Sequence, residues 1–180
     1  MIRIFDDAVP DPMNYRYRAL RLEFRTYEFG PTIFHGIATG GPCAGMLSRL
    51  HSEFELLHPS LTFFRKSPLG QVEPHFIHTD IDMGEWSALL YLNPKPKDGD
   101  GTCFWMHKDT GAIESAVPHE RSIEGRNPDN WTMRKRIDAK FNRMVVFPSS
   151  YFHSRAIHEN WGEGDDARLV QVAFGTGVLQ

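Results

Sequence analysis

Cysteine is scarce in this sequence, whose 180 residues include only Cys43 and Cys103. Two cysteines cannot build the disulfide framework of a small secreted domain, and they lack the close spacing of a structural zinc site. An apolar leader is also missing near the start, because residues 1–12 contain three aspartates. We therefore predict a reducing compartment and expect the cytoplasm as the location.

An excess of charge of one sign is missing as well. The formal net charge is −3, with 24% charged and 41% hydrophobic residues. This balance is typical of a soluble globular protein and does not favour binding to nucleic acid. No apolar run approaches the roughly 20 residues of a membrane span, so no membrane association is predicted. The length favours a single domain over residues 1–180.

The first sixty residues show helical periodicity. Asp11 and Pro12 are typical of an N-cap followed by proline at the first helical position. Apolar residues then recur at helical spacing over 12–25, and again over 46–57 before the next proline. The sequence therefore predicts two N-terminal helices within 1–60, which would support the rest of the chain.

From residue 61 onward, short apolar runs alternate with turn-forming residues, as in a β-sandwich or barrel. The predicted strands cover residues 61–64, 72–77, 87–92, 102–106, 144–147, 154–158 and 168–174. An insertion over 107–142 is too long for a simple turn, and we predict a functional lid or a mobile segment there. Residues 61–180 would thus form a β core interrupted by this insertion.

The triplet His78-Thr79-Asp80 is the first candidate site. Side chains two apart in a strand point to the same face and lie roughly 6–7 Å apart, so His78 and Asp80 can hold one ion. His153, which follows another apolar run, would supply a third ligand. Two imidazoles and one carboxylate on one face of a metal are the usual ligands of non-haem Fe(II).

Arg168 is the second candidate. Strand alternation places Arg168 on the same face as Val170, Val172 and Phe174, which should be the core side. A buried guanidinium requires an anion, either a protein carboxylate or a ligand. If 154–158 and 168–174 form a hairpin, Arg168 and His153 would face one cavity.

These features together resemble the Fe(II)- and 2-oxoglutarate-dependent dioxygenases of the prolyl-hydroxylase-like kind. The resemblance extends from about Val72 to Phe174. It is carried by the triplet at 78–80, by the strands that end at 90–93 and begin at 100–104, by Val146-Phe147-Pro148-Ser149 ahead of His153, and by Arg168. It implies a double-stranded β-helix, a jelly-roll barrel of the cupin-like type, with helices packed against the larger sheet.

The resemblance also implies residue roles. His78, Asp80 and His153 would hold the iron, and 2-oxoglutarate would chelate it while its far carboxylate pairs with Arg168 and accepts a hydrogen bond from Tyr91. Together with O2, such a site hydroxylates an unactivated C–H bond of a small-molecule or peptide substrate and releases succinate and CO2. The carboxylate of Asp80 favours a hydroxylase over a halogenase.

Three alternatives remain open from the sequence. Arg155 lies two residues after His153 and competes with Arg168 for the keto acid. A non-catalytic metal-binding jelly-roll would keep the three ligands but would not need an arginine in the cavity. A zinc-dependent hydrolase would need a general-base carboxylate near the metal, and no residue stands out for that role; Glu85 is the nearest acidic residue in sequence to the metal strand after Asp82. Within the insertion, the candidate substrate-facing residues are Trp131, Arg134, Lys135 and Arg136. Neither the substrate nor the oligomeric state follows from the sequence.

Overall fold

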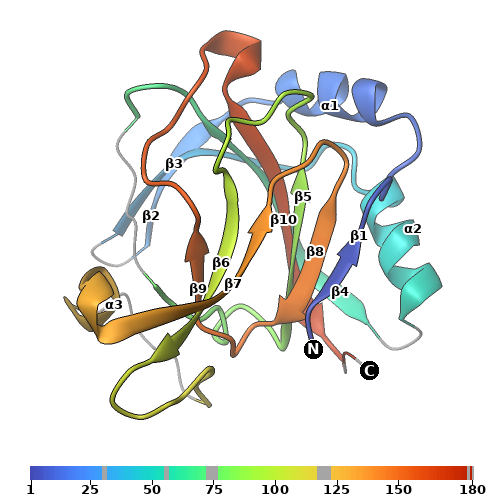
Figure 1. Ribbon diagram of the computed structural model, residues 1–180. Helices are drawn as coiled ribbons and strands as arrows, with labels where there is room; N and C mark the ends of the chain where they lie inside the picture. The colour runs from blue at the N-terminus through green and yellow to red at the C-terminus, as the bar shows by residue number, and fades with distance from the viewer. Residues whose placement is uncertain (30–31, 55–56, 72–76, 117–122, 178, 180) are drawn as a thin grey trace.

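The computed structural model describes residues 1–29, 32–54, 57–71, 77–116, 123–177 and 179 (Figure 1). The helices are α1 (Pro12–Leu20), α2 (Ala44–Glu53) and α3 (Ile123–Arg126), with 3-10 turns at Pro128–Asn130 and Gly164–Asp166. The strands are β1 (Arg3–Phe5), β2 (Arg25–Phe29), β3 (Thr32–Thr39), β4 (His58–Ser67), β5 (Trp86–Tyr91), β6 (Gly101–His107), β7 (Trp131–Asp138), β8 (Met144–Pro148), β9 (His153–Arg155) and β10 (Arg168–Thr176). None of the helices in these segments is long and apolar enough to cross a bilayer.

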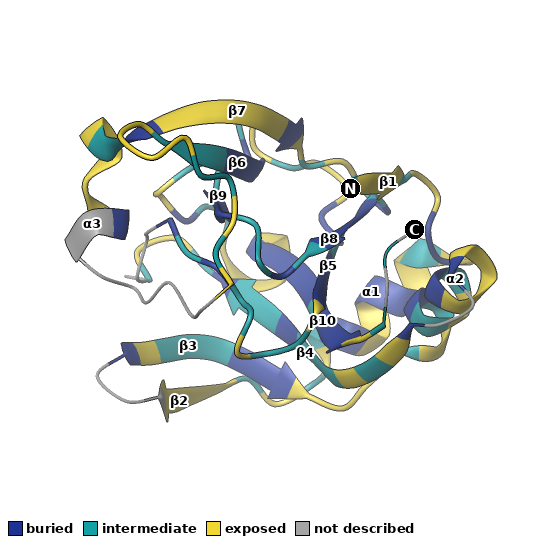
Figure 2. Cartoon of the chain, turned by 90° about the horizontal axis from the view of Figure 1, so that it is seen from below, coloured by how far each residue is buried: buried dark blue, intermediate teal, exposed yellow. Residues whose placement is uncertain are grey.

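The strands form two antiparallel sheets. The larger sheet has the order β1-β8-β5-β10-β4-β3-β2, and the smaller sheet has the order β7-β6-β9. Seen from below, the smaller sheet lies across from the centre of the larger one, and α1 and α2 lie to the side of the larger sheet (Figure 2). The predicted β-rich fold is confirmed, but over the described segments the two sheets are not joined into a closed barrel.

Alternation along β10 determines which side chains face the interior between the sheets. Leu169 and Ala173 pack on the same side as the helices, in a core that includes Tyr15 of α1 and Leu50 of α2. Val170 faces the opposite way, into a second core between the sheets. The predicted orientation of Arg168 on the inner face is therefore confirmed, because Arg168 and Val170 are two residues apart.

The structure confirms that the N-terminal region contains helices, but the first helix is shorter than predicted. Asp11 caps α1, since its Oδ1 accepts a hydrogen bond from the Asn14 N–H at 3.4 Å, and Pro12 occupies the first turn. The helix ends at Leu20 rather than near Arg25, which begins β2 and pairs with β3. The first sixty residues therefore contain strands as well as helices, and α3 lies outside them.

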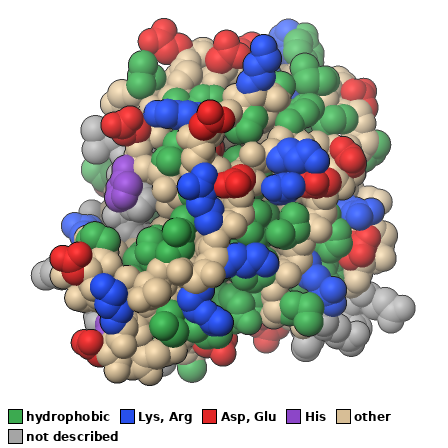
Figure 3. Space-filling view, viewed as in Figure 1, with side chains coloured by type: hydrophobic (Ala, Val, Ile, Leu, Met, Phe, Trp, Pro, Cys, Tyr) green, Lys and Arg blue, Asp and Glu red, His purple; other side chains and the backbone are tan. Residues whose placement is uncertain are grey.

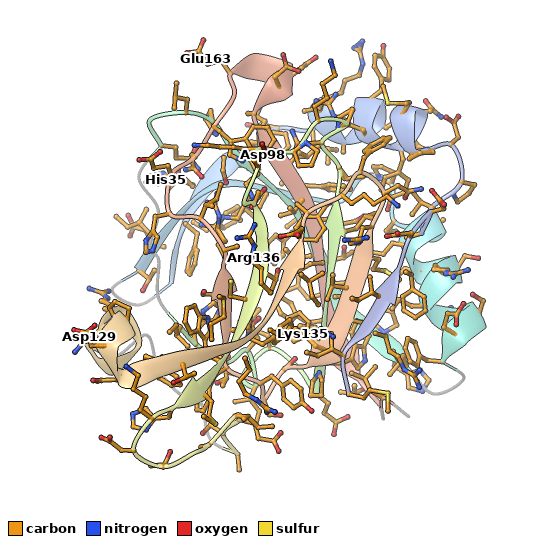
Figure 4. The ribbon with its side chains drawn as sticks, viewed as in Figure 1. His35, Asp98, Asp129, Lys135, Arg136 and Glu163 are labelled. Carbon is orange, nitrogen blue, oxygen red and sulfur yellow. The ribbon has the colours of Figure 1, made fainter. Side chains whose placement is uncertain are left out.

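The insertion over 107–142 is partly a sheet element. Its strand β7 pairs with β6 in a register that places Trp131 opposite His107 and Asp138 opposite Gly101. The prediction of a lid or mobile segment is thus wrong for 131–138, which belongs to the smaller sheet. The sequence shows no apolar alternation over β7, because five consecutive residues of this strand are exposed, among them the Lys135 and Arg136 that Figure 4 shows on this strand.

The predicted strands 72–77 and 154–158 have different outcomes. Residues 72–76 of the predicted strand 72–77 lie outside the described part of the chain. The strand predicted over 154–158 is β9, which is displaced to His153–Arg155 and pairs with β6 rather than with β10. The prediction of a hairpin between this segment and the strand of Arg168 is therefore wrong. His153 and Arg168 nevertheless line the same cavity.

Candidate metal centre

His78 and His153 are brought together by the backbone. The two residues form an isolated antiparallel bridge, in which each N–H donates to the other's carbonyl oxygen at 2.9 and 3.0 Å. Directly opposed residues in such a pair project to the same side, and the two imidazole centroids are 4.4 Å apart. The pairing of the two histidines therefore follows from sheet geometry rather than from a flexible loop.

Asp80 completes the cluster. Its N–H donates to the Ser149 carbonyl at 2.8 Å, which fixes the backbone two residues after His78. Oδ1 of Asp80 lies 3.5 Å from Nε2 of His78, and Oδ2 lies 3.0 Å from Nε2 of His153. One ligand atom from each of the three residues lies within 4.8 Å of the others. The three predicted ligands are thus brought to one place.

The hydrogen bonds of His153 select the ring nitrogen that faces the cluster. Nδ1 lies 2.9 Å from the carbonyl oxygen of Tyr151, which can only accept, so Nδ1 carries the proton. Nε2 is then the ring nitrogen on the Asp80 side, and in the neutral imidazole that keeps its proton on Nδ1 it would offer its lone pair to a metal ion. Phe147 packs edge-on against the ring at a centroid distance of 4.7 Å and limits its rotation. Such support is typical of metal-ligating histidines.

The electrostatics keep Asp80 ionised. Burial alone would raise the pKa of Asp80, but the attraction of His153 and His78 outweighs it and holds that pKa well below its ordinary value. Burial likewise opposes protonation of His153, but the charge of Asp80 raises the pKa of its imidazole. A carboxylate beside two imidazole nitrogens matches the nitrogen and oxygen ligands that a divalent transition metal accepts. These residues therefore fit a metal ion.

A cavity of about 300 Å³ opens beside the cluster, and its wall comes from both sheets. The cluster and Arg168 line the same cavity, as predicted. Arg155, on β9, also lines it, and its Nη1 donates to Oδ1 of Asn160 at 2.6 Å. The described lining residues are Tyr27, Phe34, Ile37, Phe63, Arg65, His78, Asp80, Met83, Leu89, Thr102, His153, Ser154, Arg155, Arg168, Val170, Val172 and Phe174.

The anion that Arg168 requires is supplied partly by the protein. Nε of Arg168 donates to both carboxylate oxygens of Asp100, at 2.8 and 3.1 Å, and the two side chains are only 6% and 2% exposed. Both side-chain hydrogen bonds that Arg168 makes to described residues come from Nε. The terminal nitrogens Nη1 and Nη2 therefore remain for a second acceptor in the cavity. The sequence offered one signal for Asp100, its position directly before Gly101, the first residue of β6.

Tyr91 lies behind the cavity wall. Its hydroxyl is 2.6 Å from Oγ1 of Thr102, and burial raises the pKa of Tyr91 to about 12. Tyr91 is not among the described lining residues, whereas Thr102 is. Tyr91 would therefore act on a ligand in the cavity through the Thr102 hydroxyl or from beside it. The sequence did not identify Thr102 as a residue of the site.

The residues proposed for the alternatives and for substrate contact lie elsewhere. The Glu85 carboxylate accepts a hydrogen bond from the Gly177 N–H at 2.6 Å and is not among the described lining residues. Trp131 is buried against Phe152 and Ile77. The three basic residues that follow it on β7 are exposed, on a surface where charges of both signs are interspersed (Figure 3). None of these side chains lines the cavity within the described segments.

No known protein-family model and no curated protein matches the sequence. Solved structures do match. HygX from Streptomyces hygroscopicus, solved with nickel, 2-oxoglutarate and hygromycin B, has a TM-score of 0.58 at 12% identity over 96% of this chain and 81% of its own. The epimerase SnoN from nogalamycin biosynthesis, solved with Fe3+, alpha ketoglutarate and nogalamycin RO, has a TM-score of 0.62 at 12% identity, over 96% and 77%. A Pseudomonas putida prolyl-4-hydroxylase has a TM-score of 0.56 at 16% identity, over 97% and 91%. This chain therefore has the fold of the 2-oxoglutarate-dependent oxygenases, which confirms the predicted resemblance at the level of the fold.

Proposed function

We propose that this protein is an Fe(II)- and 2-oxoglutarate-dependent oxygenase on a jelly-roll scaffold. The observation that carries the proposal is the convergence of His78, Asp80 and His153 in the wall of a cavity that Arg168 also lines. A metal-binding module without turnover would not need Arg168 there, and a zinc hydrolase would need a general base that Glu85 does not supply. Structural neighbours solved with nickel or iron and the keto acid support the assignment.

Each residue has a distinct role in this proposal. His78, Asp80 and His153 hold the metal, and the bond from Nδ1 of His153 to Tyr151 keeps Nε2 pointed at it. Asp100 orients Arg168 through Nε, so that its terminal nitrogens form a fork for the far carboxylate of 2-oxoglutarate.

Thr102 and Tyr91 would add hydrogen bonding to the same carboxylate. Tyr91 can donate to Oγ1 of Thr102, which leaves the Thr102 proton for the keto acid. The rings of Phe147 and Phe104 cover part of the His153 imidazole and limit the access of water to it. Arg155 is the competing candidate for the far carboxylate, and its Nη1 already donates to Asn160, which is not among the described lining residues.

The bound iron, keto acid and O2 would supply an oxidant able to remove hydrogen from an unactivated C–H bond, with release of succinate and CO2. Hydroxylation is the outcome we propose, with a small-molecule or peptide substrate. The structural neighbours also include the epimerase SnoN and the carbocyclase SnoK, so the same fold supports other outcomes.

The test is spectroscopic. Protein loaded with Fe(II) without oxygen should develop a weak visible charge-transfer band when 2-oxoglutarate is added, and admission of O2 should yield succinate. Arg168→Met should bind Fe(II) but show the band only at much higher 2-oxoglutarate, while Arg155→Met should resemble the wild type. Absence of the band in the metal-loaded wild type would refute the proposal, and the reverse ranking of the two variants would assign the keto acid to Arg155.

A further inference from the structure

Part of the cavity wall is not used by the proposed metal and keto-acid sites, and this part is apolar. On the inner face of the larger sheet, Val172 of β10 pairs with Leu89 of β5 on one side and with Phe63 of β4 on the other. Phe174 follows two residues later on β10, and its ring centroid lies 6.2 Å from that of Phe63. Met83 completes the group. We call these cavity-lining residues the apolar patch.

The apolar patch lies beside the metal ligands. The N–H of Met83 donates to the carbonyl oxygen of Asp80 at 2.8 Å, so Met83 belongs to the turn that Asp80 begins. Ser149, whose carbonyl oxygen accepts the Asp80 N–H, has its hydroxyl 2.7 Å from that of Ser87. Ser87 in turn pairs with Phe174 across β5 and β10. A ligand on the apolar patch would therefore be next to the metal cluster.

The proposed anchor of the keto acid occupies a different part of the same face. Arg168 and Val172 are four residues apart on β10, which corresponds to about 13 Å along the strand. Tyr91, which would assist the keto acid, lies on β5, whereas Phe63 lies on β4, on the other side of β10. A second ligand on the Phe63 side can therefore be bound together with the keto acid.

The protein leaves the apolar patch partly uncovered. Phe63, Leu89 and Val172 are only half-buried. The residue that follows each of them in the sequence faces the helices and is fully buried. Apolar surface that faces a cavity is stabilised when a hydrocarbon group covers it and releases water. The apolar patch therefore favours a hydrocarbon ligand.

The apolar patch contains no charged residue, and the charged residues elsewhere in the described lining already interact with the protein. These interactions join Asp80 to its two histidines, Arg168 to Asp100, Arg155 to Asn160, and the Arg65 guanidinium to the ring of Phe34. A charged group placed on the apolar patch would lose its water without gaining a counter-charge from these five side chains. An uncharged hydrocarbon group meets no such cost.

We infer that the substrate is a small molecule that presents an uncharged hydrocarbon group, aromatic or aliphatic, to the metal, and that this group lies on the apolar patch. The inference rests on the proposed function, because the reacting group is defined by its place beside the metal. The cavity volume of about 300 Å³, which the keto acid would share, is at the lower end of small-molecule sites and favours a small molecule over a peptide. Phe63 and Val172 are then specificity-determining residues.

The test measures the binding of neutral probes of increasing hydrocarbon size and needs no turnover. Protein loaded with Ni(II) and 2-oxoglutarate is titrated by calorimetry with propanamide, hexanamide and 3-phenylpropanamide. Each methylene that becomes buried should raise the affinity by up to about fourfold. At least one of the two larger amides should therefore bind roughly tenfold or more tightly than propanamide. Because all three probes carry the same uncharged amide, the comparison reports on the hydrocarbon part alone.

Two variants test whether this gain comes from the apolar patch. Phe63→Ala removes a ring from the patch and should reduce the gain to within about threefold. Val172→Thr keeps the branched shape but adds a hydroxyl, and it should lower the gain by at least about threefold. The matched control is Ile33→Thr on β3, at a residue that is 47% exposed and is not among the described lining residues, and it should behave as the wild type. Melting curves establish that each variant is folded, and Val172→Thr remains available if Phe63→Ala does not fold.

The outcomes separate the inference from the function beneath it. Failure of the Ni(II)-loaded wild type to bind 2-oxoglutarate would overturn the proposed function. If 2-oxoglutarate binds, the inference is overturned by an affinity that does not rise with hydrocarbon size, by undetectable binding of all three amides, or by a gain that persists in both patch variants. The affinity for 2-oxoglutarate should be unchanged within about twofold in the patch variants. Its loss there would show that the apolar patch holds the keto acid instead, which would also overturn the inference.

Discussion

Removal of Asp100 should destabilise the protein far more than removal of an exposed charge. The Arg168–Asp100 pair is nearly inaccessible to solvent, at 6% and 2% exposure, with Nε 2.8 Å from the nearer carboxylate oxygen. Oδ1 of Asp100 also accepts a hydrogen bond from the Gly101 N–H at 2.8 Å. Asp100→Ala therefore leaves a buried guanidinium without its counter-charge and a buried amide without its acceptor.

The expected loss follows from this geometry. Breaking a buried pair by removing one partner costs about 3 to 5 kcal/mol in the free energy of unfolding. For a chain of this length the melting temperature should fall by about 6–20 °C. Arg168→Met should have a similar cost, because it leaves the Asp100 carboxylate buried without its partner. The double variant should cost clearly less than the sum of the two, since it removes both charges together.

Urea denaturation at pH 7 measures all four corners of this cycle. The matched control is Arg136→Met, which removes an ion pair with Asp138 of the same 2.8 Å length but with side chains 41% and 69% exposed. The control should lose less than about 1 kcal/mol. A coupling energy between Asp100 and Arg168 below about 0.5 kcal/mol would show that the two residues act independently, and the reasoning from burial would then be refuted.

Three further predictions concern other groups. Asp80→Ala should abolish metal binding and succinate formation in a variant that still folds, and retained turnover would exclude Asp80 as a ligand. Tyr91→Phe should lower stability by about 1 to 2 kcal/mol, because Thr102 loses a buried partner. It should also weaken 2-oxoglutarate binding several-fold, whereas unchanged affinity would exclude the proposed relay. Hydrogen bonds from Arg143 hold the pKa of Asp6 below its ordinary value of 3.8. The stability difference between wild type and Asp6→Asn should therefore be present at pH 7 and shrink as the pH falls below 3.8, which urea titrations at pH 7 and pH 3 would test.

Local patterns were sufficient for the features that depend on a short stretch of chain. The two-residue alternation that placed Arg168 and Val170 on one face needs only β10 itself. The spacing of His78 and Asp80 is likewise local, and their ligand atoms meet as predicted. Asp11 and Pro12 marked the start of α1 correctly, because an N-cap depends only on the residues of the first turn.

Pairings between distant segments were not predictable in the same way. Phe24 follows the apolar period of α1 and packs against the same core, although the chain around it is extended. Burial of its ring is satisfied by either conformation, so periodicity could not locate the end of the helix. The pairing partner of β9 is β6, which lies about 50 residues earlier in the sequence. No local sequence pattern predicts such a pairing between distant segments.

The Arg168–Asp100 pair weakens the inference from a buried arginine to a bound ligand carboxylate at this site. From the sequence, a guanidinium on the inner face required an anion, and a ligand carboxylate was one way to meet that requirement. The structure meets it in part with Asp100, so burial of Arg168 alone does not identify a diacid site. The more specific feature is that only one nitrogen of the guanidinium is bound by the protein. Nε donates to Asp100, whereas the terminal nitrogens belong to a side chain that lines the cavity. A carboxylate behind the arginine both fixes its orientation and offsets its charge, so the terminal nitrogens of Arg168, rather than its burial, are the feature that favours a ligand carboxylate here.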